Sequence, residues 1–124
     1  MEKEFTLAQA RAMMPGLLAR ADELVAVRAD LVDLQASLAR GIPSELGGVP
    51  EAKGFQARLS ELLGWFGEQG LDLKGFAPLL LDFPARLGGE EVLLCWLEGE
   101  RELSWYHQSA HGFAGRRPIP PDAS

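Results

Sequence analysis

The chain has 124 residues and a net charge of −6, and 47% of its residues are hydrophobic. This length suits one domain, and the composition is typical of a globular protein rather than a disordered one. An acidic chain lacks the basic face that general binding to a phosphate backbone requires, so we expect no nucleic-acid partner.

The sequence gives no sign of secretion or of a membrane span. Cys95 is the one cysteine, so the fold cannot depend on an internal disulfide. The opening MEKEFT lacks the basic start and apolar run of a signal peptide. Apolar runs elsewhere fall far short of the roughly 20 residues that cross a bilayer. We therefore expect a cytoplasmic protein with no membrane partner.

The first expected element is helical. Thr6 and Gln9 have the spacing of a capping box, which predicts a helix start after Thr6. Pro15 has no amide hydrogen for the preceding turn, so this short helix should end or kink near Met13 and Met14. A longer helix is then expected over 15–40, because proline suits a first turn.

The stretch 15–40 has a wide apolar face. Leucines recur every seven residues, with a second apolar row beside them: Leu17, Leu24, Leu31, Leu38, and Leu18, Val25, Val32. This spacing predicts an amphipathic helix about 37 Å long. Such a helix is long for so small a domain, so we expect part of the face to form a homodimer interface.

A second helix is expected after a loop rich in glycine and proline at 41–50. Over 50–69, apolar residues fall at i, i+4, i+7 and i+11, which places them on one face: Phe55, Leu59, Leu62 and Phe66. Two helices joined by a loop of this length favour an antiparallel hairpin, here spanning 5–70.

The pattern then changes to a period of two. Strands are expected at 78–83, ended by Pro84, at 91–97, which is apolar on both faces, and at 102–107, within a sheet region spanning 71–111. Residues 112–124 read as an extended, proline-rich tail. The predicted fold is α+β and a single domain over 1–124. In it, a long antiparallel helical hairpin packs on a small antiparallel sheet of about three strands.

Polar residues gather around the predicted C-terminal hairpin. His107 continues an apolar row of its strand, and His111 follows four residues later. Asp82 stands between two apolar strand residues, where a charge needs a partner. Histidines with carboxylates suit zinc, iron or manganese. The candidate ligands of one divalent metal ion are therefore His107, Glu100, Asp82 and His111. A plain salt bridge from Asp82 to Arg86, Arg101 or Arg116 is the alternative.

Two further residues have side chains that could take part in binding or catalysis. The stretch GFAGRR resembles an anion-binding turn, because glycines free the backbone amides and arginines follow, so Arg116 is a candidate anion or ligand contact. It could instead pair with the acidic helices. Cys95 lies mid-strand among apolar residues, and we expect a small buried side chain rather than a nucleophile.

Three stretches of the chain resemble bacterial proteins of the domain-of-unknown-function family 2203. They are FTLAQARAMMPGL, LLLDFPA and EVLLCWLEGERELSWYHQSAHGFAGRRPI, and the last is the most specific. The resemblance runs from Phe5 to about Ile119. Tyr106 stands where a tryptophan is usual, and His111 where no histidine is expected. The resemblance implies no activity, but the polar residues shared with its motifs are His107, Glu100, Asp82 and Arg116.

Two functions fit these observations. The first is a homodimer that binds a divalent metal ion or a small ligand at the polar site around the C-terminal hairpin. The second is a non-catalytic dimeric scaffold in which the same polar cluster is structural. Ligands must converge within a few ångströms, whereas a structural cluster needs only pairs. No substrate or reaction follows from the sequence.

Overall fold

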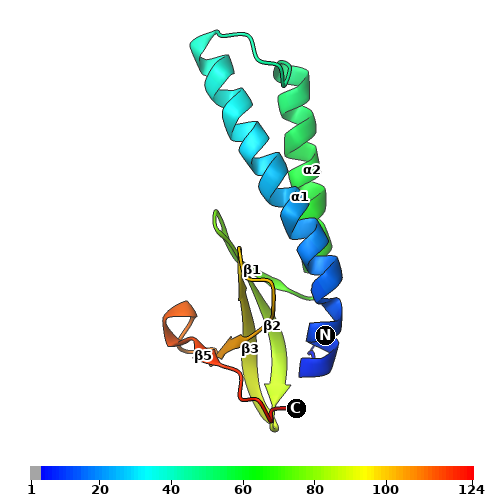
Figure 1. The fold of residues 1–124 in the computed structure, drawn as a ribbon, viewed down its shortest axis with the longest axis vertical. Coiled ribbons are helices and arrows are strands. Elements are labelled where there is room, and N and C mark those ends of the chain that lie inside the picture. Colours follow the sequence, from blue (N-terminus) through cyan, green and yellow to red (C-terminus); the bar gives the residue numbers. More distant parts are fainter. Residues whose placement is uncertain (1–3) are drawn as a thin grey trace. The chain divides into compact units, whose positions relative to one another are not determined.

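The computed structural model describes residues 4–124. Its elements are α1 (Leu7–Arg40), α2 (Val49–Glu68), β1 (Asp72–Phe76), β2 (Leu79–Leu87), β3 (Glu90–Leu97), β4 (Trp105–His107), the 3₁₀ helix η1 (Phe113–Gly115) and β5 (Arg117–Pro118) (Figure 1). The fold is α+β, as the sequence predicts. The chain forms two compact units, 1–18 with 66–124, and 19–65. Within 4–124, no helix is long and apolar enough to cross a membrane.

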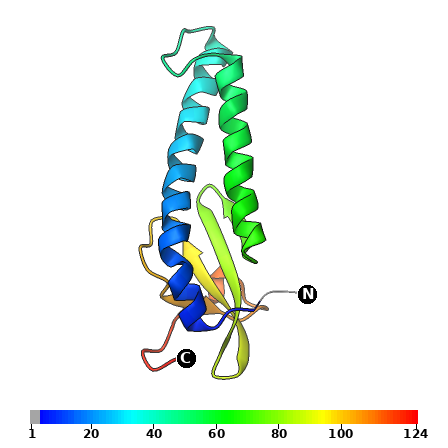
Figure 2. The ribbon, with the colours of Figure 1, turned by 90° about the vertical axis from the view of Figure 1, so that its right-hand side faces the viewer.

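The unit 19–65 is a pair of antiparallel helical segments (Figure 2). Arg58 on α2 donates to both carboxylate oxygens of Glu23 on α1, at 2.5 and 2.7 Å. The Arg20 guanidinium lies 3.8 Å from the centre of the Trp65 ring. A later residue of α1 therefore contacts an earlier residue of α2, which shows that the two segments run in opposite directions. Leucines fill the space between the two segments: Leu24, Leu31, Leu34, Leu59 and Leu62.

Helix α1 confirms the predicted start and corrects the predicted break. The Thr6 amide donates to the Gln9 side chain at 3.0 Å, and the Gln9 amide donates to the Thr6 hydroxyl at 3.1 Å. Of the predicted end or kink near Met13 and Met14, the end is wrong, because α1 continues through Pro15 for 34 residues. Proline removes one helical hydrogen bond. Burial of Met14 and Leu17 on either side offsets that loss.

The sheet has five antiparallel strands in the order β1-β2-β3-β4-β5, so the expected number of about three is wrong. Strand β1 escaped prediction because its sequence, DLKGF, is mostly exposed and lacks an alternating apolar row. Strand β5 is two residues long and lies in the stretch expected to be an extended tail. It pairs with β4, so two residues of that stretch belong to the sheet.

Strand β2 passes through Pro84, where the sequence predicted its end. Its pairing with β1 stops at Asp82. Beyond Asp82, the backbone of Phe5 pairs with the same edge of β2. The Phe5 amide donates to the Pro84 carbonyl at 2.8 Å, and the Phe5 carbonyl accepts from the Arg86 amide at 3.2 Å. This parallel bridge uses no amide hydrogen of Pro84. Strand β2 can therefore contain Pro84, because the amide hydrogen that proline lacks would face the Phe5 edge, where no acceptor requires it.

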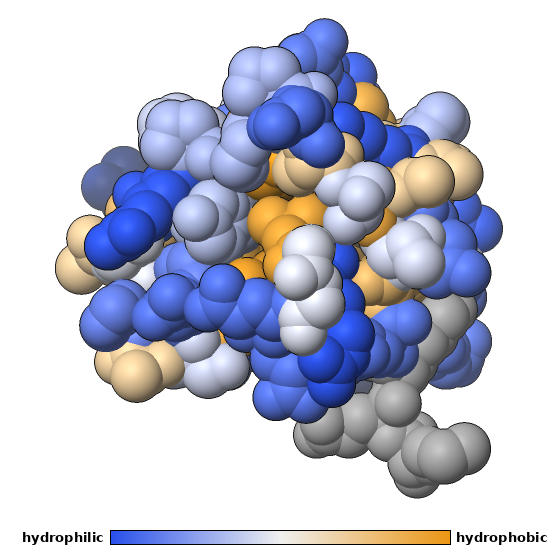
Figure 3. Space-filling model, turned by 90° about the horizontal axis from the view of Figure 1, so that it is seen from below, coloured by the Kyte–Doolittle hydropathy of each residue, from blue (hydrophilic) through white to orange (hydrophobic). Residues whose placement is uncertain are grey.

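One face of the sheet forms an apolar core. Its central side chains are 0 to 1% exposed: Leu81, Phe83, Leu94 and Trp96. Phe5 packs edge-on against Phe83, with ring centres 5.3 Å apart. On the face seen in Figure 3, hydrophilic residues surround smaller areas of hydrophobic residues. The largest fully buried side chains of this unit include Trp96, Phe66 and Phe83.

Candidate metal centre

The strand register brings three chemically active side chains to one place. Asp82 in β2 lies directly opposite Cys95 in β3. His107 in β4 lies opposite Leu93, two residues from Cys95. Because side chains alternate along a strand, these three residues share one face of the sheet. It is the face opposite the apolar core.

Asp82, Cys95 and His107 are buried together, with 2, 1 and 3% of their surfaces exposed. One ligand atom from each lies within 4.8 Å of the others. His107 Nε2 is 3.0 Å from Asp82 Oδ2, and His107 Nδ1 is 2.9 Å from the Gln108 carbonyl oxygen. Both ring nitrogens thus face oxygens. The arrangement needs one proton on Nδ1 and one between Nε2 and Asp82, so the pair is neutral overall.

This network is incomplete as a set of protein groups. Asp82 Oδ1 is buried, and it has no hydrogen-bond partner in the part of the chain that the structure describes. A buried carboxylate oxygen without a donor costs about 1–3 kcal/mol or more. Such an oxygen calls for a bound water or an ion.

Arg116 lies at the edge of the cluster and is held there by several contacts. It donates to the Cys95 carbonyl oxygen at 3.1 Å and forms an ion pair with Glu100. Its guanidinium also lies over the rings of Trp105 and Phe113, at 4.9 and 5.1 Å from their centres. Burial lowers the pKa of Arg116, but the hydrogen bonds to Glu100 and Cys95 outweigh burial and raise it. The guanidinium therefore stays charged.

The thiol of Cys95 is protonated at neutral pH. Burial is the largest cause and raises its pKa from 9.0 to about 11, while a hydrogen bond with Arg116 opposes the rise. A protonated, buried thiol is a poor nucleophile. The predicted burial of Cys95 is confirmed.

The structure places the predicted site residues in three different surroundings. His107 and Asp82 meet, and Asp82 pairs with this histidine rather than with an arginine. Glu100 turns to Arg116 and also accepts from the Leu97 amide at 2.8 Å. His111 is exposed and packs closely on Gly115. A Cβ added to Gly115 would lie 2.3 Å from the Cβ of His111.

Sequence reasoning missed Cys95 as a member of the cluster. A cysteine between apolar strand residues resembles core, and nothing around it signals a ligand. The register would have revealed it. A short turn between β2 and β3 sets Cys95 opposite the one carboxylate buried in the sheet.

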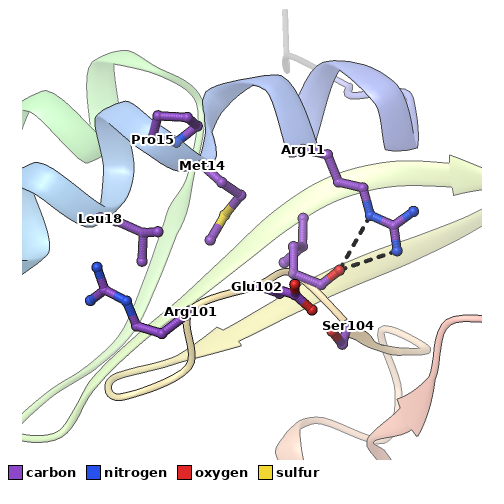
Figure 4. Close-up of a pocket in the computed structure, with 8 residues that line it drawn as sticks. Arg11, Met14, Pro15, Leu18, Arg101, Glu102 and Ser104 are labelled. Carbon is purple, nitrogen blue, oxygen red and sulfur yellow. Dashed lines mark hydrogen bonds between the residues drawn. The ribbon is translucent and has the colours of Figure 1, made fainter.

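A separate cavity of about 460 Å³ lies between residues 11–18 of α1 and residues 101–104 (Figure 4). It holds charges of both signs, from Arg11, Arg101 and Glu102. Nε and Nη2 of Arg11 both donate to the Leu103 carbonyl oxygen, at 3.4 and 3.3 Å. That arginine therefore fastens the 101–104 segment to α1. The cavity includes none of the three clustered residues.

A comparison with protein-family models gives a match over almost the whole chain. The family model described as "Uncharacterized conserved protein (DUF2203)" matches residues 3–119, which include all five strands and the whole buried cluster. It is the family that the sequence motifs resemble. Comparisons with curated proteins and with solved structures found no match.

Proposed function

Because the chain belongs to the uncharacterized conserved protein family DUF2203, its own site must supply the functional argument, and we propose that it binds one divalent metal ion at Asp82, Cys95 and His107. One observation carries this proposal. Three ligand-type atoms lie within 4.8 Å of one another in a fully buried cluster, and a carboxylate oxygen of that cluster has no partner among residues 4–124.

The donor set favours zinc among zinc, iron and manganese. A thiolate, an imidazole and a carboxylate are all accepted zinc ligands, and three protein ligands leave a fourth position open. Magnesium or calcium would instead need mainly oxygen ligands. The contact from His107 Nδ1 to the Gln108 carbonyl is the outer contact that typically orients a metal-binding histidine.

The charges of the cluster also suit a divalent ion. Metal ligands bind in deprotonated form. An ion here replaces the proton between His107 and Asp82 and the thiol proton of Cys95. Two protons leave as two positive charges arrive, so the buried cluster stays neutral. The neighbouring pair of Arg116 and Glu100 is neutral as well.

Metal content of the untagged protein tests this proposal directly. Elemental mass spectrometry is applied to the wild type and to His107→Ala, Asp82→Asn and Cys95→Ser, before and after incubation with zinc. We expect close to one ion per chain in the wild type and loss in all three variants. His111→Ala is the matched control, because it removes the exposed histidine, and it should retain the metal.

The opposite results assign the cluster to the alternative function. If the wild type stays empty with zinc, iron and manganese, or if the three variants keep their metal, the metal proposal is wrong. The cluster is then a structural element of a scaffold, in which His107 and Asp82 act as a buried pair.

We also propose that the protein forms a homodimer through α1. Within 19–65, several large apolar side chains stay exposed: Val32 at 63%, Leu38 at 38%, Ile42 at 52% and Val49 at 56%. Leu38 ends the apolar row of α1 whose earlier leucines are buried, and Val32 ends the neighbouring row, whose earlier residues are half-buried. A second copy that covers these residues would complete both rows.

Light scattering coupled to gel filtration measures the mass directly. We expect a dimer for the wild type and a monomer for Val32→Asp, because a charge in an apolar interface stays unpaired. Asp33→Ala, which alters the neighbouring exposed residue, is the control and should remain dimeric. A wild type that runs as a monomer at every concentration sinks this proposal.

A further inference from the structure

Residues 108–116, here called the cover segment, join β4 to β5 beside the buried cluster. In Figure 1 this orange segment stands out to the side of the sheet instead of continuing its strands. Its backbone hydrogen bonds are local turns: His111 to Gln108, Gly115 to Gly112 and Arg116 to Phe113. Its 3₁₀ helix η1 contains no buried residue. The segment therefore gains little from backbone pairing or apolar burial.

Side chains fasten the cover segment to the sheet. At one end, Gln108 donates to Glu90 at 3.0 Å in an exposed position. At the other end, Arg116 bonds to the Cys95 carbonyl and to Glu100. The side chains of Arg116 and Glu100 are only 13 and 23% exposed. A charge-assisted bond shielded in this way is stronger than one in open solvent.

The segment meets the cluster at both ends, through the Gln108 carbonyl oxygen at His107 Nδ1 and through Arg116 at Cys95. The guanidinium of Arg116 contacts Cys95 and interacts with the thiol strongly enough to oppose the effect of burial. In the strand register, Arg117 is opposite Tyr106, which places Arg116 next to His107 along the β4–β5 pair. Releasing Arg116 from Glu100 would thus open the cluster on the side of Cys95 and His107.

We propose that the cover segment is a gate over the cluster and that the ion pair between Arg116 and Glu100 holds it closed. Opening is local, and it leaves the rest of the sheet paired. It gives the metal ion its path to ligands that are otherwise 97% or more shielded from solvent. This role in metal access rests on the proposed metal function. The gate itself is measured without metal.

Cys95 supplies the measurement, because it is the one thiol in the chain. Metal-free protein is treated with N-ethylmaleimide, an uncharged thiol reagent, and the rate of modification is followed by mass spectrometry. Glu100→Gln removes the charge that holds Arg116 and keeps an oxygen for the Leu97 amide. We expect modification at least about tenfold faster, because Arg116 loses its charge-assisted bond to Glu100.

Glu98→Gln is the matched control. It removes the same charge two residues away, from a side chain that accepts the Leu79 amide hydrogen at 2.9 Å. Its modification rate should stay close to that of the wild type. Measurements at low urea concentrations distinguish local opening from global unfolding. If only the cover segment opens, little surface is exposed, so the modification rate of Cys95 in Glu100→Gln should not change with urea below the unfolding transition.

Other outcomes overturn the inference. If Glu100→Gln reacts no faster than Glu98→Gln, or if its rate follows global unfolding in urea, the cover segment is not a gate. The role in metal access has its own test, which is the rate of zinc uptake by the same variants. If the gate controls access, uptake should be faster in Glu100→Gln and unchanged in Glu98→Gln. If Cys95 reacts faster but no metal ever binds, the gate stands and the proposed metal function fails.

Discussion

Both faces of strands β2 and β3 contain fully buried side chains, but those side chains differ in chemistry. On one face Leu81, Phe83 and Leu94 are fully shielded, and apolar packing satisfies them. On the other face Asp82 and Cys95 are shielded to the same degree, but a carboxylate oxygen is left without a partner among the described residues. Burial alone thus fails to distinguish a face that stabilises the fold from a face that costs stability.

The apolar face should give the largest loss of stability. Phe83→Ala removes a fully buried ring that packs on Phe5, and we expect about 3–5 kcal/mol lower free energy of unfolding. Urea denaturation of the metal-free protein measures it. A loss below that of the polar-face variants would reverse the comparison between the faces.

The polar face should respond in a way that depends on which residues change together. Asp82→Leu alone leaves His107 facing apolar atoms, at a cost of about 3 kcal/mol. Adding His107→Leu should recover most of that loss, because a buried pair often yields to apolar residues without penalty. Urea melts of both variants show this, and zinc binding should be absent from each. A double variant less stable than the single one would make the pair a stabilising element after all.

The titration of Cys95 should produce an intermediate effect. Folding raises its thiol pKa from 9.0 to about 11, so the folded state holds this proton more tightly than the unfolded state. The contribution is complete below pH 9 and is lost as the pH rises toward 11, by up to about 2–3 kcal/mol. Metal-free wild type should therefore lose more stability over this range than Cys95→Ala. Parallel curves for the two proteins would show that the thiol titrates normally.

A change on neither face provides the smallest effect. Thr6→Ala removes one side of the capping box and should lower the free energy of unfolding by about 1 kcal/mol. Zinc content and Cys95 reactivity should not change. If they did, the start of α1 would be coupled to the buried cluster.

The sequence predicted the apolar face better than the polar one. Helical periodicity and the capping box predict both helices, and short apolar runs between turns predict β2 and β3, because these signals are local. The β1 and β5 strands were missed, since an exposed edge strand needs no apolar row and a two-residue strand has no period. Pro15 and Pro84 end neither element, because the neighbouring structure decides whether a missing amide hydrogen matters.

The candidate site was predicted only in part, for a related reason. Asp82 and His107 can be predicted because each is a polar residue in an apolar stretch, and the structure brings their side chains to 3.0 Å. Cys95, the third member of the cluster, is brought there by the strand register, which is a long-range property that cannot be read from one stretch of sequence. The sequence predicts Glu100 as a metal ligand from its position in the turn, but in the structure its carboxylate forms an ion pair with Arg116.

The irregular register between Leu73 and Gly75 has a consequence for how the sheet ends. A strand at the edge of a sheet offers unpaired amides and carbonyls that invite another chain to add on. In β1 the irregularity interrupts that row, and the exposed Lys74 lies within it. At the far edge, β5 is short and contains Pro118. Both borders resist templated growth, which protects the protein from edge-to-edge aggregation and leaves association to side-chain surfaces.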